Sequence, residues 1–295
     1  MIKKRILLTG ANGQLGTELS IIVPDEPSFE LIPTDINDLD ITDAESCMKI
    51  MEEEKPFCVI NCAAYTNVDR AETDVEAARK LNVDAVGNLV AACRQTDSYL
   101  IHISTDYVFD GRANIPYDED APTAPLSEYG RGKLASELIA LQYPKAMVVR
   151  TAWLYSMFSK NFLKTMMRLG REQPSINVVY DQIGTPTCAE DLAITLYKIM
   201  VGVAAGTSDF VSSVFHYSNE GVCSWYDFAY AIMSIHGLNC KINPVETKDY
   251  PTAAARPVFS VLNKSKIKKT YNIEIPHWID SLKRTLVYIE KGFDI

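Results

Sequence analysis

The sequence predicts an α/β protein with a doubly wound parallel sheet and a smaller α+β lobe towards the C-terminus. Through the first half of the chain, short apolar runs alternate with helical patterns, which is typical of a parallel sheet wrapped by helices. A glycine-rich turn follows the first apolar run. Further along, a Tyr and a Lys stand four residues apart at the start of a helical pattern.

The first elements alternate strictly. The apolar run at residues 6–9 predicts the first strand, and the pattern at 14–22 predicts the helix that follows it. A second strand is expected at 29–33. The pattern at 44–54 predicts a helix that ends before a proline, and the third strand is expected at 57–61.

The next elements continue the alternation. Residues 75–94 predict one long helix, because small and apolar side chains recur there at helical spacing: Ala78, Leu81, Ala85, Leu89 and Ala92. A fourth strand is expected at 99–104 and a fifth at 146–150. Between them, residues 127–141 predict the helix that carries the Tyr and Lys pair.

The regularity weakens in the second half. Helices are expected at 161–169 and 189–201, a strand at 176–180, and a last amphipathic helix from Trp278 to about Lys291. We expect a dinucleotide-binding domain at residues 1–155, to which residues 176–214 return. Residues 156–175 and 215–295 are expected to form the substrate-binding lobe.

Composition excludes several functions. The chain has 295 residues, 47% of them hydrophobic, and a formal net charge of -9, so a nucleic-acid partner is not expected. No apolar run approaches membrane-spanning length. The seven scattered cysteines indicate a reducing compartment. We therefore expect a cytoplasmic protein without a membrane partner.

The glycine-rich turn has the context of a dinucleotide-binding site, since it follows a strand and opens a helix. Glycines let backbone N–H groups approach a pyrophosphate, and the helix N-terminus adds positive potential. Asp35 would accept a hydrogen bond from the adenosine ribose, which favours NADH. The alternative is an ordinary glycine turn that binds nothing. The candidate residues in the turn are Gly10, Asn12, Gly13, Gln14, Leu15 and Gly16.

The Tyr and Lys pair is the catalytic candidate. Tyr129 and Lys133 share one helix face, and a nearby ammonium would lower the pKa of the phenol. Tyr129 could then protonate a ketone. Thr105 ends the fourth strand, where ligands of open α/β sheets bind, and could donate to the ketone oxygen.

These motifs resemble the Rossmann-type extended short-chain dehydrogenase/reductases and, among them, the dTDP-4-dehydrorhamnose reductase family. The glycine turn and the Tyr and Lys pair specify only the superfamily, whereas STDYVFDG, RTAWLY and DQIGTPT point to the reductases. The similarity covers nearly the whole chain, through residues 9–16, 61–72, 104–111, 129–137, 150–155, 161–169, 181–187 and 256–262.

The resemblance implies that a nicotinamide cofactor, NADPH or NADH, reduces C4 of a dTDP-4-keto-6-deoxy sugar to give dTDP-L-rhamnose. It makes Tyr129 the proton donor, places Lys133 on the nicotinamide ribose and Thr105 on the keto oxygen, and places Asp106 and Trp153 on the sugar. The cofactor groove would be lined by Gly13, Gln14, Leu15, Asp35, Asp40, Ile41, Ala63, Ala64 and Tyr65.

Several expectations concern single residues. Arg256 offers a planar fork suited to the sugar-nucleotide diphosphate, with a surface salt bridge as the alternative. His102 is expected to be a satisfied core histidine rather than a base. No metal site is expected, because no ligand spacing stands out. We expect a symmetric homodimer, because this is the commonest assembly among soluble oligomeric proteins.

Two other functions stay open. One is a sugar-nucleotide dehydratase or epimerase of the same superfamily, although a dehydratase needs a carboxylate pair and Asp106 is followed by Tyr107. The other is a non-catalytic regulatory subunit that keeps the NADP-binding fold. The presence of Thr105, Tyr129 and Lys133 argues against that subunit.

Overall fold

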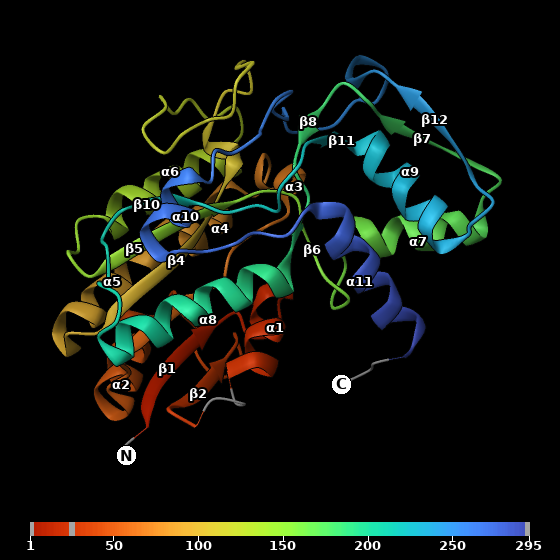
Figure 1. Ribbon diagram of the computed structural model, residues 1–295. Coiled ribbons are helices and arrows are strands. Elements are labelled where there is room, and N and C mark those ends of the chain that lie inside the picture. Colours follow the sequence, from red (N-terminus) through yellow and green to blue (C-terminus); the bar gives the residue numbers. More distant parts are fainter. Residues whose placement is uncertain (1–2, 24–26, 293–295) are drawn as a thin grey trace.

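A six-stranded parallel sheet forms the centre of the protein (Figure 1). The computed structural model describes residues 3–23 and 27–292. The strand order is β2-β1-β3-β4-β5-β10, and every neighbouring pair is parallel. The strands span Lys4–Thr9 (β1), Phe29–Thr34 (β2), Cys58–Asn61 (β3), Tyr99–Thr105 (β4), Ala146–Thr151 (β5) and Val214–His216 (β10). The predicted doubly wound parallel sheet is confirmed.

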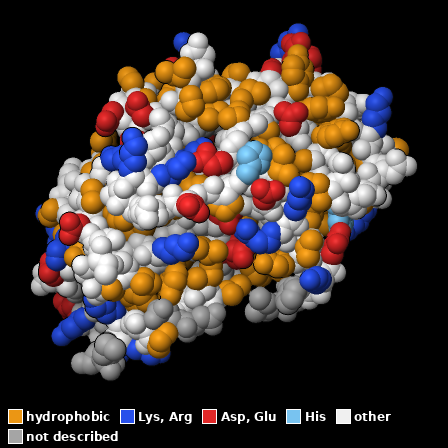
Figure 2. All heavy atoms as spheres, in the orientation of Figure 1, with side chains coloured by type: hydrophobic (Ala, Val, Ile, Leu, Met, Phe, Trp, Pro, Cys, Tyr) orange, Lys and Arg blue, Asp and Glu red, His pale blue; other side chains and the backbone are white. Residues whose placement is uncertain are grey.

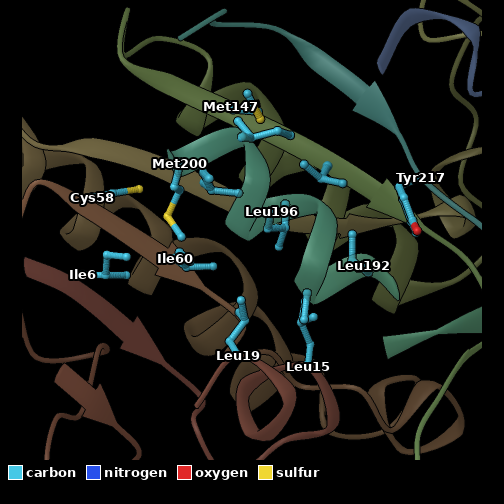
Figure 3. Packing of buried hydrophobic residues seen from close by; sticks show 14 of the residues in the cluster. Ile6, Leu15, Leu19, Cys58, Ile60, Met147, Leu192, Leu196, Met200 and Tyr217 are labelled. Carbon is cyan, nitrogen blue, oxygen red and sulfur yellow. The ribbon is translucent and has the colours of Figure 1, made fainter. Parts of the chain in front are cut away.

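Helices cover both faces of this sheet, because successive strand residues point to opposite sides. Ile6 and Leu8 pack on the face covered by α1 and α8, and Figure 3 shows this cluster. Leu7, between them, packs on the other face against α2 and α5. The helices of these layers span Gln14–Ile22 (α1), Ala44–Glu54 (α2), Ala85–Thr96 (α5), Glu128–Ala140 (α6), Ala189–Ala205 (α8) and Ser265–Tyr271 (α10).

A second group of elements lies beside the sheet, around its own apolar cluster (Figure 1). Tyr155, Phe228 and Trp278 are among its buried members. Its elements include Phe162–Glu172 (α7), Ser175–Val179 (β7), Trp225–His236 (α9), Lys241–Val245 (β12) and Trp278–Glu290 (α11). Short strands pair nearby, at Leu154–Tyr155 (β6), Ile183–Gly184 (β8), Thr187–Cys188 (β9) and Cys223–Ser224 (β11).

The expected single helix at 75–94 is wrong in one respect. The structure divides it into Val75–Arg79 (α4), a π-helical turn at Lys80–Asp84, and α5. The side chain of Asn82, in that turn, bonds both the backbone N–H (2.8 Å) and the backbone carbonyl (3.1 Å) of Tyr65. These contacts hold the turn against the loop after β3. The shorter helix Val68–Ala71 (α3) precedes it.

The surface of the protein carries charged side chains of both signs. On the face shown in Figure 2, acidic, basic and apolar side chains are interspersed. Among the described residues, no helix is long and apolar enough to cross a membrane. The residue boundaries expected for the two lobes stay a prediction.

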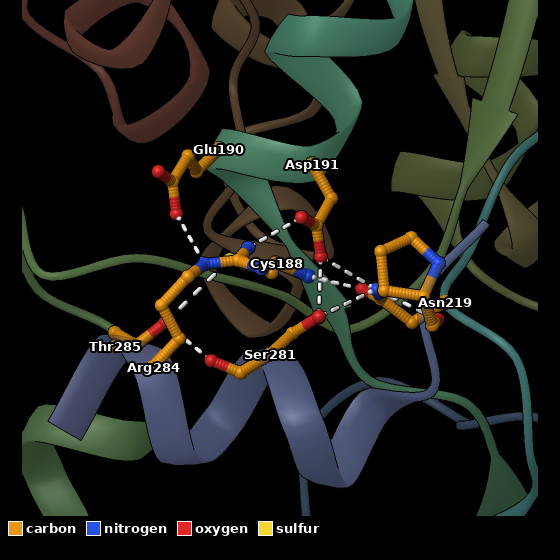
Figure 4. Close-up of polar contacts among 8 residues, drawn as sticks. Cys188, Glu190, Asp191, Asn219, Ser281, Arg284 and Thr285 are labelled. Atoms are coloured by element: carbon orange, nitrogen blue, oxygen red, sulfur yellow. Dashed lines mark hydrogen bonds and ion pairs between the residues drawn. The ribbon is translucent and has the colours of Figure 1, made fainter. Parts of the chain in front are cut away.

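A polar network ties α8 to α11 (Figure 4). The Asp191 carboxylate, on α8, accepts hydrogen bonds from Asn219 (2.7 Å) and from Ser281 of α11 (2.5 Å), and it pairs with Arg284 of α11. Arg284 also pairs with Glu190 at 2.9 Å. Because Asp191 is 4% exposed, its partners hold a charge that would otherwise be expensive to bury.

Glu18, on α1, lies next to this network and gives stability a pH dependence. Burial, together with the nearby Glu190 and Asp191 carboxylates, raises the pKa of Glu18 to about 8, against the lowering effect of Arg284. The folded protein therefore keeps a proton that the unfolded chain releases at its ordinary pKa of 4.5. This contribution to stability is complete below pH 4.5 and is lost as the pH rises towards 8.

We therefore expect Glu18→Gln to flatten the decline in unfolding free energy between pH 5 and 8, which for one proton is at most about 1.4 kcal/mol per pH unit. Urea unfolding at several pH values measures it. The exposed residue Glu52 supplies the control, and Glu52→Gln should keep the wild-type slope. Equal slopes in all three proteins would contradict the assignment.

Candidate active site

A cleft of about 670 Å³ opens beyond the carboxyl ends of β1, β3, β4 and β5. The chain passes from β1 to β2 on one side and then crosses to β3 on the other, so β1 and β3 flank the point where the strand order reverses. Ligands of open α/β sheets bind at such a point. The expected site residues that line the cleft are Gly10, Gly13, Gln14, Leu15, Gly16, Asp35, Ile41, Ala63, Ala64, Thr105, Asp106, Tyr129, Lys133 and Trp153.

The glycine turn forms one end of the cleft, and two of its glycines are required by close approaches. Gly10 has a φ of +67°, and a Cβ there would lie 2.7 Å from the Ala63 backbone nitrogen. A Cβ on Gly16 would lie 2.2 Å from the Gly10 carbonyl oxygen. These glycines let the turn fold tightly against the start of α1 and the loop after β3 while it lines the cleft, as a pyrophosphate site needs.

Asp35 stands beside this turn and helps to shape it. Its carboxylate accepts hydrogen bonds from the backbone N–H groups of Asn12 (2.9 Å) and Ile36 (2.8 Å). The carboxylate that was expected to bind a ribose hydroxyl therefore stabilises the glycine turn. A carboxylate has lone pairs beyond these two bonds, so both roles are compatible.

The Tyr129 phenol is buried at the base of the cleft. The Thr105 hydroxyl lies near enough to influence its pKa, and the Tyr107 ring lies edge-on at 5.6 Å. Burial raises the pKa of Tyr129 to about 12; the Thr105 hydroxyl lowers it and the Asp106 carboxylate raises it. The pKa of Tyr129 is therefore raised rather than lowered as expected, because burial and the Asp106 carboxylate together outweigh the Thr105 hydroxyl. At neutral pH the phenol carries its proton.

Lys133 lies one helical turn further along α6 and is also buried. Its ammonium donates to the Ile103 carbonyl at 2.6 Å and lies 3.3 Å from His102 Nε2. Burial lowers the pKa of Lys133 to about 8, whereas Glu137 and Cys62 raise it. Near pH 7 the side chain is therefore mostly charged, with a small neutral fraction.

Thr105 and Asp106 complete the polar part of the cleft. The Thr105 hydroxyl donates to the Asp106 carboxylate at 3.0 Å and accepts from the Tyr107 N–H at 3.2 Å. Burial raises the pKa of Asp106 to about 6, and the nearby hydroxyls of Ser260 and Thr105 oppose that rise. Two groups able to hold a proton, Tyr129 and Asp106, therefore flank the Thr105 hydroxyl.

Aromatic side chains form the opposite wall. Trp153 stacks on Trp225, with ring centroids 3.7 Å apart and planes 10° apart. The backbone of Trp153 has a φ of +49°, an unusual conformation for a large side chain. Gly184 lies under the indole, where a Cβ would come within 2.6 Å of the ring. A flat apolar wall of this kind suits a sugar or a base.

Four expected site residues are not part of the cleft lining. The Asn12 backbone bonds Asp35 and Ser159, and the Asp40 carboxylate bonds Thr42. The Tyr65 phenol donates to Asp74 at 3.1 Å, and Arg256 forms an ion pair with Asp69 at 2.7 Å. Partners outside the cleft lining thus hold the side chains of Asp40, Tyr65 and Arg256. Arg256 takes the alternative expected for it, a salt bridge, although only 24% of its side chain is exposed.

The structure adds residues that the sequence did not reveal. Trp225 reaches the cleft from the start of α9, and Ser159 and Lys160 reach it from the segment before α7. These residues are distant in sequence from the glycine turn, and no local pattern distinguishes them. Their position depends on how the second group of elements packs beside the sheet.

A model of one protein family matches most of the chain. The family is described as the RmlD substrate binding domain, and the match covers residues 4–290. The chain belongs to this family. The resemblance drawn from the sequence motifs is confirmed.

Relatives in the family are similar along their full length. The dTDP-4-dehydrorhamnose reductase of Aggregatibacter actinomycetemcomitans is 38% identical, over 97% of this chain and 99% of the relative. The reductase of the same name from Burkholderia thailandensis is 40% identical, over 93% and 95%.

Solved structures show the same fold. The dTDP-4-dehydrorhamnose reductase of Bacillus anthracis, in complex with NADP, superposes with a TM-score of 0.92 at 36% identity, over 97% of this chain and 99% of that one. The dTDP-glucose 4,6-dehydratase of the same organism, with NAD, reaches a TM-score of 0.80 at 17% identity, over 99% and 98%, which shows a shared fold only.

We expect Gly16→Ala to weaken cofactor binding, because its Cβ would force the Gly10 carbonyl away. An overpacked contact costs about 1–3 kcal/mol, which corresponds to about fivefold to 150-fold in affinity if it is lost from binding. Fluorescence titration with NADPH and NADH measures it. Gly87, in α5, provides the control, since nothing lies within 4 Å of a Cβ there. Unchanged affinity in Gly16→Ala would separate this turn from cofactor binding.

Proposed function

We propose that the protein reduces the C4 ketone of dTDP-4-dehydro-β-L-rhamnose to dTDP-β-L-rhamnose with NADPH or NADH, in dTDP-L-rhamnose biosynthesis. One observation supports this most: Thr105, the protonated Tyr129 and Lys133 line one cleft, which extends from the glycine turn to Trp153. The names of the relatives supply the choice of sugar nucleotide.

The glycine turn fits the cofactor, since Gly10, Gly13 and Gly16 line the cleft at the start of α1, and the close packing at Gly10 and Gly16 leaves no room for a side chain. Gly13, Gln14, Leu15 and Asp35 would hold the pyrophosphate and adenosine end, and Ala63 and Ala64 would lie along the middle. The bound dihydronicotinamide supplies the hydride that C4 of the sugar receives.

The chain's own residues handle the proton. As the hydride reaches C4, the keto oxygen gains negative charge and takes the Tyr129 proton, giving the C4 hydroxyl. Thr105 would stabilise the developing charge after its hydroxyl turns from Asp106 to the keto oxygen. The Lys133 ammonium would hold the nicotinamide ribose and favour the phenolate that remains.

The sugar would lie between Asp106 and Trp153. Asp106 would accept hydrogen bonds from sugar hydroxyls, and the stacked pair of Trp153 and Trp225 would contact the apolar face of the ring. Dehydration is disfavoured, because Tyr107 occupies the position after Asp106 where a second acid would be needed. We retain Arg256 as a candidate for the diphosphate if its ion pair with Asp69 opens.

Three further expectations belong to the proposal. We propose that the protein is located in the cytoplasm, where its seven cysteines would stay reduced. We propose that the protein assembles as a symmetric homodimer. The cofactor and substrate parts correspond to residues 1–155 with 176–214, and to residues 156–175 with 215–295.

We expect Tyr129→Phe to lower kcat by about two to four orders of magnitude while NADPH still binds, because only the proton donor is removed. The assay follows NADPH oxidation with dTDP-4-dehydro-L-rhamnose formed by preceding enzymes. Tyr65→Phe is the matched control, since that phenol bonds Asp74 outside the cleft lining. Tight cofactor binding without turnover in the wild type would instead favour the regulatory-subunit alternative.

We expect Asp35→Asn to raise the preference for NADPH over NADH about tenfold. The amide oxygen can still accept from the Asn12 N–H, although the hydrogen bond from the Ile36 N–H is lost, and the charge that repels a 2′-phosphate is removed. The ratio of kcat/KM for the two cofactors measures the change. An unchanged ratio would show that Asp35 supports the loop without selecting the cofactor.

A further inference from the structure

A buried chain of hydrogen bonds runs across the sheet towards Lys133. The Thr9 hydroxyl, on β1, donates to Asn61 Oδ1, on β3, at 2.7 Å. Asn61 Nδ2 lies 3.1 Å from Nδ1 of His102, on β4, and His102 Nε2 lies 2.9 Å from the Ser136 hydroxyl, on α6. The four side chains are at most 1% exposed, so water does not replace these contacts.

The direction of each hydrogen bond follows from groups that have only one role. The backbone N–H of Ala63 donates to Asn61 at 3.2 Å, which fixes the amide oxygen on that side and the NH₂ group towards His102. His102 Nδ1 must then accept. The proton of the neutral imidazole is therefore on Nε2, where it is donated to Ser136.

Ser136 agrees with this assignment. Its hydroxyl donates to the backbone carbonyl of Lys133 at 2.7 Å, so its lone pairs face the His102 N–H. Burial, and then Lys133, lower the pKa of His102 well below its ordinary value, which keeps the ring neutral. The expectation that His102 is a satisfied core histidine is confirmed.

The consequence concerns the Lys133 ammonium, 3.3 Å from His102 Nε2. Both groups carry hydrogens there, so the imidazole offers no lone pair to the ammonium. An ammonium has three N–H donors, of which one is given to the Ile103 carbonyl. The other two stay available to the cleft.

We propose that His102 is a positioning residue for the ketone reduction: its Nε2–H tautomer, set by Asn61 and the Ala63 N–H, withholds an acceptor from Lys133 and leaves two ammonium donors for the cofactor ribose and Tyr129. This inference rests on the proposed function. The charged and titratable groups around Lys133 are His102 from β4, Glu137 and Tyr129 from α6, and Cys62 after β3.

The opposite tautomer would have a measurable effect. With its lone pair on Nε2, His102 would accept from the Lys133 ammonium, stabilise the charged form, and raise the pKa of Lys133. One donor would be lost to the cleft. The amine would also stay charged to a higher pH, which extends the alkaline side of the pH profile.

The tautomer is tested without any assay. Nitrogen-15 NMR of histidine-labelled protein distinguishes Nε2–H, Nδ1–H and doubly protonated rings, and His102→Gln identifies the His102 signals by their loss. We expect a neutral Nε2–H ring throughout pH 5–8. Titration near pH 6.5, or an Nδ1–H ring, would overturn the proposal, and this outcome is independent of whether the sugar is turned over.

The positioning role is tested by Asn61→Asp. A carboxylate accepts from Thr9 and Ala63 as before, but it also requires an N–H on His102 Nδ1 and so reverses the tautomer. We expect the alkaline limb of the kcat/KM profile to move up by about one pH unit, and KM for the cofactor to rise. The negative charge that this substitution adds would by itself also raise the pKa of Lys133. The same substitution must therefore be tested in a protein that lacks the imidazole.

The His102→Leu variant is that protein. If the imidazole transmits the effect on Lys133, Asn61→Asp shifts the alkaline limb of the kcat/KM profile in the otherwise wild-type protein but not in the His102→Leu variant. An equal shift in both would mean that charge acts through space, and the proposal would fail. Should Asn61→Asp not fold, His102→Gln offers an amide oxygen to Lys133, and the same upward shift relative to His102→Leu is expected; no difference between these two would overturn the proposal.

Discussion

The docking of α6 onto the end of β4 is the constraint on which the site depends. Lys133 and Glu137, one turn apart on α6, are both buried; Lys133 bonds the Ile103 carbonyl, and Glu137 bonds Ser104 and pairs with Arg150 of β5 at 2.7 Å. Buried charges are tolerated only with such partners, so the helix has one favourable register. That register places Tyr129 against Thr105.

The rest of the protein keeps two surfaces in place around this helix. On one side, the glycine turn is held by Asp35 and by contacts too close for any Cβ. On the other, the network around Asp191 fixes α11 to α8 (Figure 4). Trp278 of α11 in turn packs against Phe228 of α9, the helix that begins at Trp225 of the aromatic wall. The cleft is therefore built between a sheet edge and a packed neighbour, as is usual for small-molecule sites.

Local sequence accounted for most of the sheet and the polar half of the site. Apolar runs located the strands because buried parallel strands have little room for polar side chains. The predictions from sequence failed where contacts between residues far apart in the chain determine the local structure. The π-helical turn depends on Asn82 bonding Tyr65, and burial reverses the expected pKa change of Tyr129. Arg256 pairs with Asp69, 187 positions away in the chain.

By itself, the sequence determined the fold class, the glycine turn, and the Tyr129 and Lys133 pair, because each depends on spacing within one element or turn. Tertiary structure alone decided that Trp225 faces Trp153 and that Thr9, Asn61 and His102 set the environment of Lys133. Those contacts join elements far apart in the chain, and their hydrogen-bond directions follow only when every buried donor and acceptor is matched.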